Sequence, residues 1–531
     1  MRAKLGTLFT VFGLAGMCGE VFRLKLPSAS WFFDTSRRLS FLHRTDQEWY
    51  PYGDTFPWYG WVTAVLVTLV GLVMLGGALK RRAPHPATLR RQRRFREVKR
   101  GVWSLRILLG LVALASLDFM IVGDKPLFLK NGDTYCFPAF ERKVYKGADF
   151  GLEGELAEAP ANFRALRKVL HMPPEKVLVM PLIPYAPTGD AQPPLLQDLK
   201  ESEGQYLTTK GEPYSGLAAR VYAAEDGTEE VSLHIRYRLR EGRLSGPADG
   251  WSRAGDRVYS ASYGEGAEML SQEYYGEGRL RDFKKASVQG LKVVQYHPAP
   301  PNRDHLLGTD SSGNDVLAYL FGGLQVNIQA ALFYIPCVYC IGVTIGLLMG
   351  YFGGIFDLVL QRIIEALEAI PFLFVILIIS SVIPIEFKGL GMILGILIAF
   401  GWMGKTYLMR TAAYREKARD YVASARVIGA SNLRVLIKHI LPNILSILVT
   451  VIPFAISGVV TSITSLDYLG FGLPPRYASW GKLLNDGLSN LSSPWLVSAA
   501  FLVLVTLLIL ITFVGEAVRE AWDPRKFTTY R

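Results

Sequence analysis

Cysteine and other metal-binding side chains are scarce in this sequence. Four cysteines occur among 531 residues, and only Cys136 lies in the long polar middle of the chain, which excludes a disulfide framework there. Cys337 and Cys340 form a C-x-x-C motif inside an apolar run with no second pair nearby. We therefore interpret them as two packed thiols rather than as a zinc or redox site. The seven histidines are scattered, and the sequence predicts neither a metal site nor another cofactor.

A nucleotide-binding loop is also missing. Gly404-Lys405-Thr406 looks like the end of a phosphate-binding loop, but Ala399 stands where that loop needs its first glycine. Glu365 and Glu368 could pass for a catalytic carboxylate pair, yet their spacing beside Arg362 favours one charged face of a short interfacial helix. We therefore expect no enzyme activity from this chain.

Long uncharged apolar runs, by contrast, are abundant. Hydrophobic residues make up 50% of the chain and the mean hydropathy is +0.23. A helix that crosses a ~30 Å hydrocarbon layer needs ~20 apolar residues. Eight runs come near this length: Leu5–Gly19, Trp58–Ala78, Leu105–Val122, Val326–Gly350, Ile370–Ile385, Leu390–Met409, Ile444–Ile463 and Trp495–Val514. We therefore predict a multi-pass membrane protein.

The formal net charge of +12 is concentrated in a few segments. Ten basic residues lie between Lys80 and Arg100, against the single acidic residue Glu97. Such a run could bind nucleic acid or an acidic lipid surface. Because it lies between two apolar runs, we favour a cytoplasmic loop that follows the positive-inside rule, with no nucleic-acid partner. The basic loop 410–443 then also faces the cytoplasm, and the polar region 125–301 lies outside.

The polar region 125–301 interrupts the membrane pattern. Aromatic residues are frequent in it, which argues against disorder. Val231–Leu239 alternates polar and apolar residues, as a half-buried strand does. We expect an independently folded α+β domain, with this strand at an edge that Arg236, Arg238 and Arg240 protect by charge.

The loop 411–442 is long and contains two helical patterns separated by Gly429. Gly429 predicts the end of the first helix, and Ser431 predicts a cap for the second. The second pattern predicts an apolar stripe formed by Leu433, Leu436, Ile437 and Ile440. Such a pair could present a rigid knob to a cytoplasmic partner, or could simply connect two spans.

This loop resembles the coupling motif of ABC importer permeases, which docks into a groove of the ATPase. The residues that correspond to the motif are Ala425, Gly429, Ala430, Ile440, Leu441 and Pro442. Ala423 stands in place of the motif's glutamate and Ser424 in place of its first alanine. The departure removes any polar contact of that glutamate but retains the helix–glycine–helix pattern.

Other stretches are similar to the dipeptide and oligopeptide branch of this family, in the family's order. One motif on the outer side comprises His305, Gly308, Thr309, Asp310, Gly313 and Asp315. Gly353-Gly354 with Asp357 matches a further stretch, and Gly515-Glu516 with Asp523 and Arg525 matches the tail. The outer-loop motif comprises Asp467, Gly470, Gly472, Pro474 and Trp480. Within the branch, Thr464–Gly472 most resembles the permeases of microcin C uptake systems.

The resemblance implies an all-α polytopic membrane protein, a type I ABC importer permease core with an inserted extracytoplasmic α+β domain. Its parts would be an extra N-terminal membrane segment over 1–98, a first core helix over 99–124, the outer domain over 125–301, and five core helices over 302–531. The implied partners are a second homologous permease, two ABC ATPase subunits, an extracytoplasmic peptide-binding protein and the lipid bilayer.

The resemblance also implies a location in the bacterial inner membrane and a cargo of oligopeptides or modified peptides. The outer mouth, with Tyr468, Phe471, Tyr477 and Trp480, is aromatic rather than charged, so a binding protein is expected to select the cargo. Pro371 and Pro453 are expected as kink points. Two other readings stay open, a membrane-anchored enzyme or binding domain and a self-sufficient secondary transporter.

Overall fold

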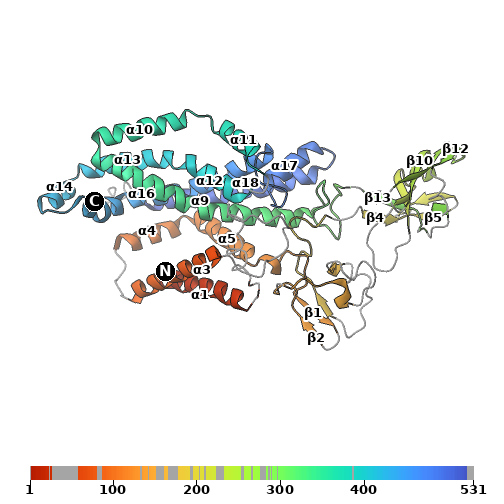
Figure 1. Ribbon diagram of the computed structural model, residues 1–531, viewed down its shortest axis with the longest axis horizontal. Helices are drawn as coiled ribbons and strands as arrows, with labels where there is room; N and C mark the ends of the chain where they lie inside the picture. The colour runs from red at the N-terminus through yellow and green to blue at the C-terminus, as the bar shows by residue number, and fades with distance from the viewer. Residues whose placement is uncertain are drawn as a thin grey trace.

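The computed structural model separates a helical body from strand-rich lobes at one end (Figure 1). It describes residues 2–22, 24, 26, 58–79, 86–131, 134–141, 143–150, 161–164, 177–191, 195–202, 204–208, 211–222, 233–252, 256–264, 267–275, 283–284, 288, 290–295, 297–384 and 388–522. Lys80 and the tail residues Asp523 and Arg525 lie outside these ranges.

The helices fall into an N-terminal group and a larger C-terminal group. The first group is α1 (Arg2–Val21), α3 (Trp58–Leu79), α4 (Pro86–Glu97), α5 (Lys99–Ser116) and the 3-10 turn η1 (Asp118–Met120). The second is α9 (Val316–Phe352), α10 (Gly354–Glu368), α11 (Phe372–Val382), α12 (Leu390–Gly401), α13 (Met403–Lys417), α14 (Asp420–Val427), α15 (Asn432–Arg434), the π-helix η4 (Val435–Ile440), α16 (Leu441–Tyr468), α17 (Trp480–Ser489) and α18 (Pro494–Trp522).

Helix α9 is central to the C-terminal group, where it packs on α12, α13 and α16. Gly342, Gly346 and Gly350 lie one turn apart on the face that meets α13. A Cβ atom at Gly346 would lie 2.5 Å from the carbonyl oxygen of Thr406, and one at Gly350 would lie 2.5 Å from that of Arg410. The stripe of small residues therefore allows the two backbones to touch, which is how helices associate inside a bilayer.

Four described helical segments are long and apolar enough to cross a membrane: Val316–Phe352, Leu390–Lys417, Asn432–Tyr468 and Pro494–Trp522. Helices α10 and α11 form a fifth if they count as one span, although they are bent by 68°. The break lies at Pro371, which precedes α11, because proline cannot continue the helix before it. Pro453 lies inside α16, and α9 contains Pro336, a further kink candidate that the sequence analysis overlooked.

The N-terminal helices do not reach the apolar length of these four segments. Within the described residues, Leu5–Gly19 and Ala64–Gly77 are shorter apolar helices, and they belong to α1 and α3, which pack on each other. Helix α5 begins at Lys99 and ends at Ser116, and it contains Arg106. It packs on α18 rather than standing alone.

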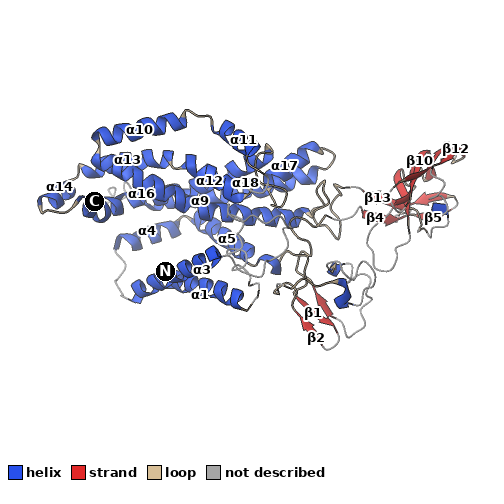
Figure 2. Cartoon of the chain, viewed as in Figure 1, coloured by secondary structure: helices blue, strands red, loops and turns tan. Residues whose placement is uncertain are grey.

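The strands form two lobes, drawn in red in Figure 2. The proximal lobe contains β1 (Phe128–Asn131), β2 (Thr134–Cys136) and β3 (Val177–Val179) in the antiparallel order β2-β1-β3, with the 3-10 turn η2 (Gly147–Phe150). The distal lobe contains β4 (Leu195–Asp198), β5 (Lys200–Ser202), β6 (Gln205–Leu207), β7 (Gly216–Val221), β8 (Leu233–Arg240), β9 (Arg243–Leu244), β10 (Gly246–Trp251), β11 (Arg257–Tyr263), β12 (Met269–Tyr274) and β13 (Lys292–Gln295). Its main sheet has the order β12-β11-β10-β8-β7-β13-β4.

Strand β8 confirms that Val231–Leu239 contains a strand, but its place in the sheet differs from the prediction. The prediction of an edge strand is wrong, because β8 pairs with β7 on one side and β10 on the other. Arg236 does not protect an edge; it pairs with Asp249 of the neighbouring strand at 3.2 Å. The edges are β12 and β4, and every residue of β12 is exposed.

The two cysteines of α9 also differ from the prediction. Cys337 and Cys340 are both exposed, so they are not packed thiols in this chain. In the same turns of α9, the buried face is formed by Val338, Tyr339 and Gly342. Helical periodicity therefore turns both cysteines away from α13.

Candidate functional site

The predicted pair of helices around Gly429 forms a projection at the α14 end, which we call the knob (residues 420–440). Helix α14 ends at Val427, and Gly429 follows with a φ of +86°. The N–H of Ala430 donates to the carbonyl of Ala425 at 3.0 Å, and the N–H of Gly429 donates to that of Arg426 at 2.9 Å. This is a glycine-terminated helix end, in which a left-handed residue turns the chain back.

The second half of the knob differs from the predicted α-helix. After the short α15 the chain forms a π-helix, whose wider turn buries Val435, Leu436 and Ile440. Leu433 and Ile437, which also belong to the predicted apolar stripe, are exposed. The four residues of the stripe therefore do not share one buried face, because the π-helix departs from the 3.6 residues per turn on which the stripe was based.

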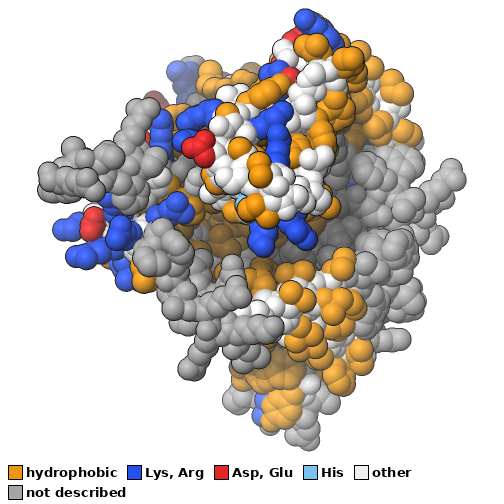
Figure 3. Space-filling model, turned by 90° about the vertical axis from the view of Figure 1, so that its left-hand side faces the viewer, with side chains coloured by type: hydrophobic (Ala, Val, Ile, Leu, Met, Phe, Trp, Pro, Cys, Tyr) orange, Lys and Arg blue, Asp and Glu red, His pale blue; other side chains and the backbone are white. Residues whose placement is uncertain are grey.

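The tip of the knob is apolar and open. Val427 and Ile428 are 87% and 85% exposed. Lys and Arg side chains prevail over acidic ones on the described surface at this end, with hydrophobic side chains between them (Figure 3). Exposed side chains of this size beside a cationic rim are typical of a protein-binding surface.

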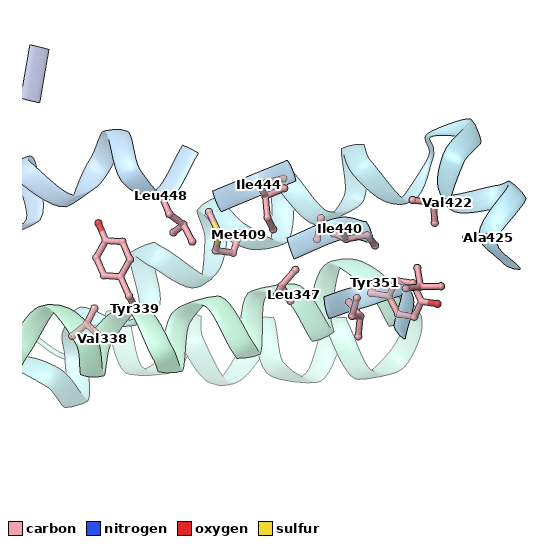
Figure 4. Close-up of a cluster of buried hydrophobic side chains, with 14 of the residues drawn as sticks. Val338, Tyr339, Leu347, Tyr351, Met409, Val422, Ala425, Ile440, Ile444 and Leu448 are labelled. Atoms are coloured by element: carbon pink, nitrogen blue, oxygen red, sulfur yellow. The ribbon is translucent and has the colours of Figure 1, made fainter. Parts of the chain in front are cut away.

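The underside of the knob belongs to a buried apolar cluster that continues into the spans (Figure 4). Val422 and Ala425 of α14 and Ile440 of the π-helix pack in the same cluster as Leu347 of α9 and Met409 of α13. Of the predicted coupling residues, Ala425 and Ile440 are thus buried, Leu441 is half-buried, and Gly429 and Pro442 are exposed. The cluster thus joins the knob to the long helices α9, α13 and α16 through continuous apolar packing.

Polar contacts fasten the same junction. Tyr351, at the end of α9, donates from its hydroxyl to Asn432 at 2.7 Å. The guanidinium of Arg426 lies 4.9 Å from the centre of the Tyr351 ring. Ser431 is the N-cap residue of α15, the position predicted for it, but its side chain makes no capping hydrogen bond.

An ion pair that the sequence analysis did not predict connects α10 to α13. Arg410 donates from Nε and Nη2 to the two carboxylate oxygens of Asp357, at 2.5 and 2.6 Å. Tyr414 adds a third hydrogen bond to this carboxylate at 2.7 Å. Asp357 is only 3% exposed, so the pair fixes the start of α10 on α13.

The predicted outer-side motif forms a buried polar network before α9. His305 and Asp315 are both buried, with Nδ1 and Oδ2 2.9 Å apart. The other oxygen of Asp315 caps α9 by accepting the N–H of Ala318 at 2.8 Å. Thr309 accepts the N–H of Ala299 at 2.8 Å, and its Oγ1 lies 2.6 Å from Nδ1 of His297. These residues position the backbone and leave few polar atoms free for a cargo.

Asp310, Gly308 and Gly313 shape the same segment. Asp310 accepts the N–H groups of Ser312 and Asn314, at 2.9 and 2.8 Å, and burial raises the pKa of its carboxyl group. Gly308 has a φ of +74°, and a Cβ atom there would lie 2.5 Å from the carbonyl oxygen of Ala299. Gly313 also has a positive φ, of +85°.

The predicted outer-loop motif forms a second buried polar group at the end of α16. The carboxylate of Asp467 accepts the N–H of Leu473 at 2.5 Å and the hydroxyl of Ser479. Trp480 begins α17 and donates from Nε1 to the carbonyl of Leu320 at 2.9 Å. Tyr477 and Trp480 are both buried, so the expectation that they line an outer mouth is wrong. Pro474 accepts the N–H of Tyr477 and completes the turn at 3.0 Å.

A segment of the proximal lobe lies against this end of the helices; we call it the strap (residues 181–190). Ile183 exchanges backbone hydrogen bonds with Ile121 and Gly123 after α5, at 2.8 and 3.1 Å. The ring of Tyr185 lies 4.6 Å from that of His305, and Thr188 donates to the carbonyl of Arg476 at 3.1 Å. The strap was not predicted, because no local pattern in the sequence marks a contact over this distance.

Comparison with known proteins shows the extent of the similarity. Residues 342–528 match the family model for the inner membrane component of binding-protein-dependent transport systems. The chain is 31% identical over 441 residues to the inner membrane ABC transporter permease protein YejE of Escherichia coli K12, covering 83% of this chain and 98% of that protein.

Two further relatives cover less of the chain. The peptidoglycan transport system permease protein YejE of Agrobacterium fabrum is 41% identical over 220 residues, which are 41% of this chain and 57% of that protein. The oligopeptide transport system permease protein OppC of Lactococcus lactis subsp. lactis is 29% identical over 248 residues, covering 46% and 84% of the two chains.

Proposed function

The chain belongs to the family of inner membrane permeases of binding-protein-dependent ABC importers, and from this premise we propose that it conducts peptides or modified peptides into the cell. It is a multi-pass inner membrane protein. The observation that carries the proposal is the knob, an apolar tip on a buried cluster that reaches into three long helices. Such a unit can carry a movement of its tip to the spans.

We propose that the tip of the knob seats in an ATPase subunit. Val427 and Ile428 would supply the apolar contact, and Gly429 would set the angle between the two helices. Ala425, Ala430, Ile440 and Leu441 would support this contact from beneath, and Pro442 would follow them in the first turn of α16. The chain has no phosphate-binding loop of its own, so ATP hydrolysis in the importer belongs to two such partners.

The proposed topology places the knob in the cytoplasm and both strand lobes outside. The excess of Lys and Arg at the α14 end supports it, since basic residues accumulate on the cytoplasmic side. A second homologous permease would complete the pore. Rocking of the two permeases would open it to either side, and the bend at Pro371 gives α10 and α11 a natural hinge.

We propose that a separate binding protein selects the cargo and delivers it to the lobes. The buried state of Thr309, Asp315 and Asp467 supports this division of labour, because these groups are already hydrogen-bonded within the chain. The names of two relatives refer to peptidoglycan and oligopeptide transport, which supports oligopeptides, cell-wall peptides included, as the cargo.

The distal lobe is the proposed docking surface for that binding protein. Replacing 195–295 with a short Gly/Ser linker spares the strap and the proximal sheet, so the helical body should remain stable. Uptake stimulated by the binding protein should fall, while basal ATPase activity of the complex stays. Full stimulation without the distal lobe would contradict the docking role.

Reconstitution of the importer in proteoliposomes tests the central proposal. With ATPases, second permease and binding protein present, Ile428→Asp should reduce peptide uptake at least about tenfold, because a charge enters an apolar contact. Leu491→Asp, at a position 76% exposed between α17 and α18, places the same charge on another open apolar residue and should leave peptide uptake unchanged. Uptake by the purified chain alone, without ATPases, would contradict the proposal.

A further inference from the structure

Helices α4 and α5 carry a row of cations that the proposed transport function does not use. The two helices follow each other with one residue, Val98, between them. Arg90, Arg93, Arg96 and Lys99 recur every third residue along this pair. Within α4, at 1.5 Å per residue, the charges of Arg90, Arg93 and Arg96 are about 4.5 Å apart along the axis, and Lys99 follows at the start of α5, after the break at Val98. All four residues are exposed, and together we call them the cationic stripe.

The opposite face of α4 is attached to the end of α18. Arg91, Arg94 and Phe95 are half-buried on this side. The guanidinium of Arg91 lies 4.2 Å from the centre of the Trp522 ring. Arg100 pairs with Glu516 at 3.1 Å, and Gly101 lies so close to Ala517 that no side chain would fit between them. The stripe is therefore held in one orientation by contacts on its other side.

These contacts also place the stripe beside a membrane surface. Helix α18 is one of the four long apolar segments, and its apolar run ends at Val514, before Glu516, Arg519 and Trp522. A tryptophan at such a junction is typical of the headgroup region. Because Arg91 and Arg100 contact this part of α18, the stripe lies at or just beyond the headgroups of the same leaflet.

Little within the stripe neutralises its charge. Glu97 lies 3.8 Å from Arg93, but their side chains are 65% and 88% exposed. An exposed pair of this kind contributes little and is screened by water. Helix α4 contains five arginines and one glutamate, a net charge of 5 − 1 = +4 over twelve residues.

We propose that the cationic stripe binds the headgroup phosphates of anionic phospholipids in the surrounding leaflet. Arg and Lys near a membrane surface are attracted to anionic lipid, and each arginine can bind a phosphate with two hydrogen bonds. The bilayer itself presents phosphates at this depth, which favours lipid over nucleic acid. The bound lipid would fix α4 and α5 against α18 and so anchor the N-terminal helices to the permease body.

The test uses the full-length chain in a neutral detergent. Native mass spectrometry would measure retention of phosphatidylglycerol and, in parallel, of phosphatidylcholine. In the variant R90Q/R93Q/R96Q the retention of phosphatidylglycerol should decrease at least roughly tenfold, since each cation near the surface adds to the attraction. Retention of phosphatidylcholine should not change.

A matched control removes three exposed cations elsewhere. K200Q/R238Q/R243Q, in the distal lobe, has the same change of net charge and should retain phosphatidylglycerol like the unaltered chain. Equal loss in both variants, or unchanged retention in the stripe variant, would overturn the proposal. Binding of short RNA or of inorganic phosphate that competes fully with the lipid would also overturn it. Circular dichroism of each variant confirms that its helices are intact.

Discussion

The knob and the polar network at the opposite end of the helices are held by different forces. The knob rests on an apolar cluster and exposes an apolar tip. At the strand end, Thr309, Asp315 and Asp467 are buried, and each accepts a backbone N–H. Apolar packing has no fixed direction, whereas a buried hydrogen-bond network specifies one arrangement. The strand end is thus built to stay in place, and the knob is built to meet a partner.

The largest loss of stability is expected at Trp480, which combines apolar packing with a buried hydrogen bond. Trp480 fills the contact between α17 and α9, where Gly323 leaves room for its ring. Trp480→Ala should lower the free energy of unfolding by about 3–5 kcal/mol, as large-to-small core changes do. Chemical denaturation in detergent measures this. Trp103→Ala, at a residue 60% exposed, is the matched control and should change stability little; similar losses in both would show that α17 is not fixed by Trp480.

The knob should respond next, and in transport rather than in overall stability. At Gly429 the φ of +86° is closed to proline, and proline also removes the N–H that bonds to Arg426. Gly429→Pro should cost about 3 kcal/mol at the turn and reduce uptake to background while the protein still inserts. Gly429→Asn is the control, because asparagine tolerates a left-handed backbone. Normal coupled ATPase activity in the proline variant would contradict the role of the knob.

A smaller effect tests the hydroxyl group of Thr309, which accepts the N–H of Ala299 and lies 2.6 Å from Nδ1 of His297. Thr309→Val preserves the shape of the side chain but leaves the N–H of Ala299 without its acceptor in a buried position. The free energy of unfolding should fall by about 1–3 kcal/mol. Thr309→Ser retains the hydroxyl, so its free energy of unfolding should decrease by less than that of the valine variant. If the valine variant is as stable as the unaltered chain, hydrogen bonding does not hold the strand end in the way that we infer, and the contrast with the knob fails.

Local patterns predicted the elements of both ends, but not their partners. The helix–glycine–helix form of the knob was predictable, because Gly429 and the helical periodicity are local signals. The exposure of Leu433 and Ile437 was not predictable from their place in the apolar stripe, since a π-helix changes the periodicity and no local signal in the sequence indicates it.

Contacts between distant residues were out of reach for the same reason. Asp357 and Arg410 are 53 positions apart, and nothing local pairs them. Strand β8 was predicted correctly, but its central position depends on β7 and β10, which the alternation of one strand cannot reveal. The strap contacts His305 through the fold of the proximal lobe, and no local pattern around Tyr185 indicates this contact.

The smallest expected effect tests a residue at which a local rule and the structure disagree. Sequence rules place a helix cap at Ser431, and replacing such a cap by alanine typically costs ~1 kcal/mol. In the structure the side chain of Ser431 makes no capping bond, although its carbonyl accepts the N–H of Val435 at 3.0 Å. Alanine keeps that backbone bond, so Ser431→Ala should change the free energy of unfolding by less than ~0.5 kcal/mol. Asp315→Ala, which removes a cap that does bond to Ala318 and also the partner of His305, is the contrasting variant. A loss near 1 kcal/mol at Ser431 would mean that its hydroxyl caps the second helix of the knob, which would then be fixed by a directional bond as the strand end is.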